Sequence, residues 1–131
     1  MTKSVLLLAA VVSLTITAPA FAADDTESTK ASTKVEGDSN GNYTKKTNYE
    51  HTDAAGTTST DNTKVKVKTN SKGDVTKTYE TDSSNDPKGL MNKTTDKSTT
   101  TVKENADGTS SYKHKEKVNG KTVEEENTTS N

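Results

Sequence analysis

Hydrophobic and polar residues alternate in short stretches of the chain. The stretch from Val65 to Tyr79 shows this most clearly, with valine and lysine alternating before a four-residue turn and valine, threonine, lysine and tyrosine after it. The turn runs from Asn70 to Gly73. Asn at the first position of a type I turn caps its own backbone, and Gly at the fourth accepts the left-handed conformation. Period-two alternation with β-branched residues is typical of strands, so this stretch is predicted to be a β-hairpin.

The same Asp/Asn-x-x-Gly turn recurs at strand-length intervals. In the turn at residues 86–89, Pro87 takes the second position, where the fixed φ of proline is favourable. The turns lie at residues 38–41, 53–56, 70–73, 86–89 and 105–108, with Asn119-Gly120 as a final two-residue turn. They predict strands near residues 28–37, 42–52, 57–69, 74–85, 90–104, 109–118 and 121–127. The predicted fold class is all-β: an up-and-down antiparallel meander of about seven strands, thin or single-layer.

The turn geometry also predicts which residues face each other. If each turn closes with a one-residue bulge, Val65 lies opposite Tyr79 and Lys64 opposite Glu80. The first two hairpins then contain like-charge contacts, because Lys46 faces both Lys34 and Lys64. The same geometry predicts further pairs: Val35 with Lys45, Lys30 with Glu50, Val102 with Tyr112, Lys115 with Glu124, Lys113 with Glu126, and His114 with Glu125.

The apolar positions do not keep one parity along the chain. They are odd through Tyr79, whereas Leu90, Val102, Tyr112 and Val118 are even, so regular turns would move the apolar stripe to the other face near residue 90. A bulge within residues 83–92 would restore it, since one extra residue reverses every following side chain. The alternative is that each half of the sheet has its own apolar side.

Composition limits the kind of core that the chain can build. After residue 22 there are few large apolar side chains, no Trp and no Cys. A closely packed two-layer core is therefore not expected, and a disordered chain is the alternative to a thin sheet. The regular placement of Gly and Pro favours the sheet. The absence of Cys excludes disulfides and thiolate metal sites.

The two ends of the chain are predicted to lie outside the hairpin repeat. A basic start, an apolar run from Val5 to Val12 and the Ala20-Phe21-Ala22 site are typical of a secretory signal peptide at residues 1–22. The run is shorter than the ~20 residues that a membrane span needs, so no span is expected. Residues 23–29 and 128–131 are predicted to be flexible ends around a hairpin repeat at 30–127. The leader predicts export to the periplasm or beyond.

Charge argues against one class of partner. All 18 basic residues are lysines, and the formal net charge is −1. Arg is the residue of bidentate phosphate and base recognition, and nucleic-acid binders carry a basic excess. We therefore expect no nucleic-acid binding.

Candidate metal-binding and catalytic residues are few. The segment Asp38-Ser-Asn-Gly-Asn42 has the spacing of half a calcium loop, but Tyr43 and Tyr49 stand where such a loop needs Gly and Glu. A plain turn is predicted there, and the oxygen-rich segment 82–86 is interpreted in the same way. His51 and His114 lie on different predicted strands, without an apolar cleft to support catalysis. The prediction is no catalytic, cofactor-binding or metal-binding residues, and no enzymatic activity.

These observations predict a class of function without naming a partner. The expected protein is an exported, non-catalytic bacterial protein with a structural or binding role in the periplasm or at the cell surface. The alternative is a largely disordered polar periplasmic protein associated with stress or cations. An open meander has two edge strands, and these carry unequal charge: Lys30 and Lys34 with Glu36 on one, Glu124 to Glu126 on the other. Weak edge-to-edge self-association is therefore expected.

Overall fold

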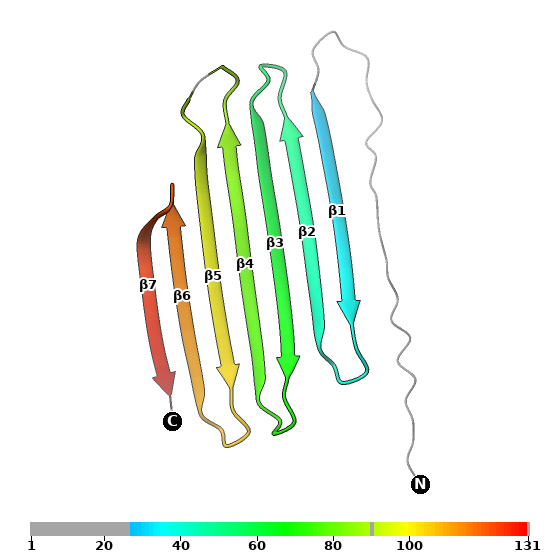
Figure 1. Cartoon of the computed structure of the whole chain (residues 1–131), viewed down its shortest axis with the longest axis vertical. Helices are drawn as coiled ribbons and strands as arrows, with labels where there is room; N and C mark the ends of the chain where they lie inside the picture. The colour runs from blue at the N-terminus through cyan, green and yellow to red at the C-terminus, as the bar shows by residue number, and fades with distance from the viewer. Residues whose placement is uncertain (1–26, 90, 131) are drawn as a thin grey trace.

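The computed structural model describes residues 27–89 and 91–130, which form one open antiparallel sheet with the strands in chain order (Figure 1). No residue in this described part is buried, so the sheet has no core on either face. The predicted single-layer meander of seven strands is confirmed. The strands are β1 (Ser28–Gly37), β2 (Tyr43–Thr52), β3 (Thr58–Thr69), β4 (Val75–Asp86), β5 (Thr94–Glu104), β6 (Ser110–Val118) and β7 (Lys121–Ser130).

Several boundaries lie close to their predicted places, and two differ. Strand β5 begins at Thr94 rather than near residue 90, and β7 continues to Ser130, past the predicted end at 127. The predicted signal peptide lies outside the described residues. Within the described ranges the chain forms no helix that could cross a membrane.

Four of the five predicted four-residue turns have the expected geometry. In the turn at 70–73 the Gly73 amide donates to the Asn70 carbonyl at 3.1 Å, and the Asn70 amide donates to the Asp74 carbonyl at 3.0 Å. The second bond closes the one-residue bulge. Gly73 has a φ of +90°, which a residue with a side chain rarely adopts. The turns at 38–41, 53–56 and 105–108 repeat this pair of hydrogen bonds.

The connection between β4 and β5 is longer than predicted, and it settles the question of the apolar stripe. Asn85 pairs with Thr94, so odd positions of β4 face even positions of β5; Tyr79, for example, faces Thr100. Directly opposed residues in an antiparallel pair have their side chains on the same face. The change of parity in the sequence is therefore cancelled by the loop, and the apolar stripe stays on one face across the sheet.

The last hairpin corrects the predicted register. Val118 pairs with Lys121 as expected, but a β-bulge follows between Glu116 and Lys117, and the remaining pairs are shifted by one residue. Lys115 faces Glu125 rather than Glu124, and His114 faces Glu126 rather than Glu125. Lys113 faces Asn127 rather than Glu126. The predicted pairs of the β1–β2, β2–β3, β3–β4 and β5–β6 hairpins, including the Lys34–Lys46 and Lys46–Lys64 contacts, are confirmed.

Side chains join neighbouring hairpins where a core would otherwise do so. The Asp74 carboxylate accepts a hydrogen bond from the Ala106 amide at 3.0 Å, linking the turn after β3 to the turn after β5. The Asn42 side-chain oxygen accepts from the Thr69 amide at 2.6 Å. At the opposite end of the sheet the Asn119 side-chain oxygen accepts from the Thr95 amide at 2.8 Å. These bonds tie the ends of successive hairpins together.

Candidate functional site

The two faces of the sheet have different chemistry. The face that carries the apolar stripe, here called the apolar face, also bears both histidines. Its apolar side chains are only partly covered, and the exposed fraction of Tyr43, Tyr49 and Tyr79 exceeds two fifths. The strand register assigns these apolar residues to it: Ala31, Val35, Tyr43, Tyr49, Val65, Val67, Val75, Tyr79, Val102, Tyr112 and Val118.

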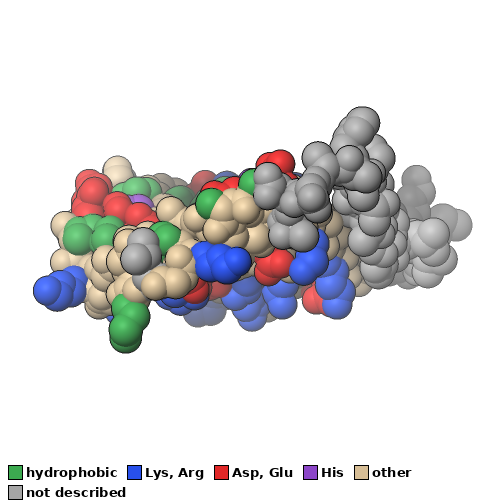
Figure 2. Space-filling view, turned by 90° about the horizontal axis from the view of Figure 1, so that it is seen from above, with side chains coloured by type: hydrophobic (Ala, Val, Ile, Leu, Met, Phe, Trp, Pro, Cys, Tyr) green, Lys and Arg blue, Asp and Glu red, His purple; other side chains and the backbone are tan. Residues whose placement is uncertain are grey.

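The opposite side, here called the lysine face, carries most of the basic residues. Figure 2 shows blue lysine side chains along one side of the sheet, and mainly green, red and purple groups on the other. No large apolar side chain of the regularly paired strand positions points to the lysine face. The strand register places these lysines on it: Lys30, Lys34, Lys46, Lys64, Lys66, Lys68, Lys97, Lys103, Lys113, Lys115 and Lys117.

These lysines are regularly spaced. Alternate residues of β3 form one series, Lys64, Lys66 and Lys68, and alternate residues of β6 form a second, 113, 115 and 117. Neighbours within a series lie roughly 7 Å apart at the backbone, and the two strands lie three positions apart, or about 14 Å. Threonines of β4 and β5 lie between the series. The result is a flat array of positive charges.

The acidic residues of the lysine face are all paired. Glu50 lies 2.9 Å from the Lys30 ammonium, Glu80 lies 2.7 Å from that of Lys64, and Glu125 lies 2.8 Å from that of Lys115. The remaining pairs are Lys34–Glu36 at 2.6 Å, Lys97–Asp82 at 2.5 Å and Lys93–Asp86 at 3.8 Å. In the oxygen-rich segment 82–86, both aspartates thus pair with lysines.

Five lysines on this face have no acidic partner among the described residues. They lie on β2, β3 and β6, and their ammonium groups are left to solvent or to a ligand. They are Lys46, Lys66, Lys68, Lys113 and Lys117.

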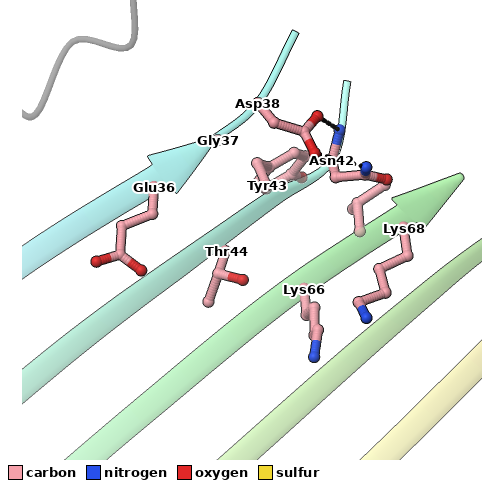
Figure 3. A pocket seen from close by; sticks show the side chains of 9 residues that line it. Glu36, Gly37, Asp38, Asn42, Tyr43, Thr44, Lys66 and Lys68 are labelled. Carbon is pink, nitrogen blue, oxygen red and sulfur yellow. Dashed lines mark hydrogen bonds between the residues drawn. The ribbon is translucent and has the colours of Figure 1, made fainter. Parts of the chain in front are cut away.

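One end of the array borders a shallow pocket. Figure 3 shows Lys66 and Lys68 side by side on β3, with Thr44 on the neighbouring β2 and Glu36 on β1 beyond it. At its rim the Asp38 carboxylate accepts bonds from the Asn42 side-chain amide at 2.8 Å and the Asn40 backbone amide at 2.8 Å. These bonds hold the pKa of Asp38 below its usual value. Asp38 therefore acts as the cap of its own turn.

The two histidines occupy similar places on the apolar face. The Nδ1 atom of His51 lies 3.0 Å from the Thr29 hydroxyl, and Nδ1 of His114 lies 2.8 Å from the Thr100 hydroxyl. Their acidic neighbours differ. His51 has Glu27 at 3.5 Å. His114 forms a cluster with Glu116 and Glu124, in which one ligand atom from each residue lies within 4.8 Å of the others.

The sequence pattern did not predict this cluster. With the regular register, Glu124 would point to the lysine face opposite Lys115. The bulge moves it to the apolar face opposite Glu116. The sequence shows His114 and Glu116 two residues apart on β6 and three consecutive glutamates on β7, but the face on which Glu124 lies depends on the bulge.

Comparison with protein families, with curated proteins and with solved structures found no match to this chain.

Proposed function

We propose that the protein is an exported, non-catalytic binding element of the bacterial envelope, whose lysine face binds an anionic polymer with repeated phosphate or carboxylate groups. The observation that carries the proposal is the charge balance of this face. Each of its acidic residues is paired with a lysine, and five lysines are left without an acidic partner among the described residues. The signal peptide predicted at residues 1–22 supports an envelope location.

The shape of the face supports an extended ligand rather than a small one. The unpaired lysines are spread over β2, β3 and β6 instead of converging on one point. A single exposed ion pair is weak, at roughly 0.2–1 kcal/mol. An extended polyanion contacts several such lysines at once, so the weak contacts add up, and added salt weakens binding by screening them.

A polysaccharide or phosphate-rich envelope polymer suits this face better than a nucleic acid. Base and phosphate recognition in nucleic-acid binders depends strongly on the planar fork of arginine, which the chain lacks. Lysine binds anionic groups as a point charge without demanding a fixed orientation. The array is therefore suited to binding a polymer through its density of negative charge rather than through its sequence of units.

The experiment uses the mature chain, residues 23–131 after the predicted signal peptide. It measures binding to two probes, polyphosphate and polygalacturonate, at low and high salt. Replacing Lys46, Lys66 and Lys113 by Gln should weaken binding about tenfold, since three contacts of the size quoted for exposed ion pairs are lost. The matched control replaces Lys45, Lys72 and Lys121 by Gln. It makes the same change in net charge, on the apolar face and in a turn.

The control variant should bind within about twofold of the unmodified protein. Equal weakening of both variants would mean that net charge alone drives binding, and the proposed role of the lysine face would be wrong. Tighter binding to double-stranded DNA than to either probe would also contradict it.

A further inference from the structure

We propose that His114, Glu116 and Glu124 form a binding site for a divalent transition-metal ion of the zinc class. The three side chains come from β6 and β7 and lie on the apolar face, away from the lysine face. One ligand atom from each lies within 4.8 Å of the others, so small rotations of the two glutamates bring all three to metal-binding distance. The site does not depend on the proposed polymer binding.

The β-bulge between Glu116 and Lys117 assembles this cluster. It sets Glu116 directly opposite Glu124 and His114 directly opposite Glu126 on the same face. Without it, Val123 would face Glu116, and Glu124 would lie on the other face. Bulges redirect side chains at sheet edges and next to functional sites, and β7 is the edge strand here.

The Glu116–Glu124 pair is unfavourable unless a cation lies between the two carboxylates. Like charges directly opposite each other on neighbouring strands destabilise a sheet. No ion pair joins either glutamate to a lysine among the described residues. By contrast, Glu125, which directly follows Glu124 in the sequence, forms an ion pair with Lys115 on the lysine face. A bound divalent cation would remove the repulsion at Glu116 and Glu124.

The ring of His114 is held in a suitable orientation. Its Nδ1 atom is engaged with the Thr100 hydroxyl at 2.8 Å, which leaves Nε2 to bind a metal. With a cation on Nε2, Nδ1 carries the proton and donates to the threonine oxygen, an arrangement common to histidine ligands. The ring also lies nearly parallel to that of Tyr112, with an interplanar angle of 14° and centroids 6.5 Å apart.

The donor set indicates the class of metal. Imidazole nitrogen favours zinc and its neighbours, whereas calcium takes six to eight oxygen ligands. One histidine and two carboxylates leave at least one position of a tetrahedral ion open for water. Glu126 faces His114 in the register, but its carboxylate accepts a hydrogen bond from the Thr128 hydroxyl at 3.5 Å and is not part of the cluster.

The structure provides matched controls on the same sheet. His51 lies on the apolar face with the same threonine contact but without a pair of facing glutamates. Glu125 is adjacent to Glu124 in sequence but points to the lysine face. A site that depends on the cluster should be lost with His114 or Glu124 and retained when His51 or Glu125 is changed.

The experiment is a titration of the mature protein with Zn²⁺ by calorimetry, in a buffer that does not bind zinc, with amide NMR spectra to locate the perturbed residues. Zn²⁺ should bind one site and shift the amide signals of β6 and β7. His114→Ala and Glu124→Gln should each weaken binding at least tenfold. His51→Ala and Glu125→Gln should stay within about twofold, and circular dichroism should show that all four variants keep the sheet.

Three results would overturn the proposal: no Zn²⁺ binding tighter than millimolar, equal losses in His51→Ala and His114→Ala, or signal shifts spread over all the acidic residues. Calcium provides a further arm. Stronger binding of Ca²⁺ than of Zn²⁺ would show that the carboxylates act without the histidine, and would also contradict the assignment.

Discussion

Asp74 shows how a single polar side chain connects neighbouring hairpins, which a hydrophobic core does in most proteins. Its carboxylate accepts hydrogen bonds from the Ala106 amide at 3.0 Å and from the Asn70 side chain at 2.9 Å, and only 17% of its side chain is exposed. These bonds, the first in particular, hold the pKa of Asp74 below its usual value. Asp38 and Asp107 have lowered pKa values for the same reason, because amides and hydroxyls of their turns donate to them.

Because folding lowers the pKa of the turn carboxylates, we predict that the folded chain loses stability in acid. A group whose pKa is lowered by folding stabilises the folded chain at neutral pH, and this contribution is lost as the pH falls through the folded pKa. The free energy of unfolding should therefore decline as the pH drops through and below the usual range of aspartate. Asp74→Asn should be less stable at pH 7 and should show a flatter decline in acid, measured by urea denaturation from pH 7 to pH 2. Asp61→Asn, which changes a strand residue outside the turns, is the control; an equally flattened profile there would contradict the role of Asp74.

At the scale of strands and hairpins, most of the fold could be predicted because the turn signals are local. Asp or Asn followed by Gly three residues later specifies both the turn and its one-residue bulge, so the pairs around Asn70 and Asn105 follow from arithmetic. The connection after β4 does not follow this rule. It continues to Lys93, and the extra residues change which parity faces the apolar side.

The last hairpin was mispredicted for a different reason. The Asn119-Gly120 turn fixes the pairing only next to itself, and β7 has few apolar residues to fix the rest. Exposed Lys–Glu pairs contribute little to stability, so the pattern of charges was a weak guide to register. The cluster of His114, Glu116 and Glu124 depends on that register, and hence it could not be predicted from the spacing of its residues.

A pair of cysteines tests the register of β6 and β7 directly. The chain has no native cysteine, so an introduced pair reports only on itself. Residues directly opposite each other have Cβ atoms roughly 4.5–5.5 Å apart, close to the separation that a disulfide bridges. Glu116→Cys with Glu124→Cys should therefore oxidise readily to an intramolecular disulfide. Lys115→Cys with Glu124→Cys should not, and preferential oxidation of this second pair, seen by intact mass, would restore the unbulged register.

At the scale of the whole molecule, the sheet combines two unlike faces with two unlike edges. The faces separate most lysines from the apolar and histidine side chains, so a ligand bound on one side leaves the other accessible. The edges are β1, with Lys30 and Lys34, and β7, with the three glutamates 124–126. An odd number of strands means that β1 and β7 run in the same direction (Figure 1).

This arrangement limits how copies of the chain can associate through their edges. Pairing β7 of one copy with β1 of the next brings Glu125 to the same face as Lys30 and Lys34, whereas Glu124 and Glu126 lie on the apolar face. Pairing two β7 edges would instead bring the glutamates of both copies together. The β7–β1 pairing is parallel, which is slightly less stable per residue than antiparallel pairing, and it does not close, so it produces open chains rather than dimers. We therefore predict a monomer in dilute solution that associates weakly when concentrated, with added salt weakening the association.

Sedimentation from micromolar to millimolar protein, at low and high salt, checks this prediction. Replacing Glu124, Glu125 and Glu126 by Ser removes the acidic edge, so the association at low salt should fall to the level seen at high salt. The control replaces Asp61, Asp96 and Glu116 by Ser, an equal change of charge on inner strands, and should leave the association unchanged. If the unmodified chain stays monomeric at millimolar concentration, or if both variants associate alike, the charge difference between the two edges does not direct assembly. Antiparallel dimers, the form that like edges would give, would contradict the head-to-tail arrangement most directly, because they would show that backbone pairing outweighs the repulsion between edges of the same sign.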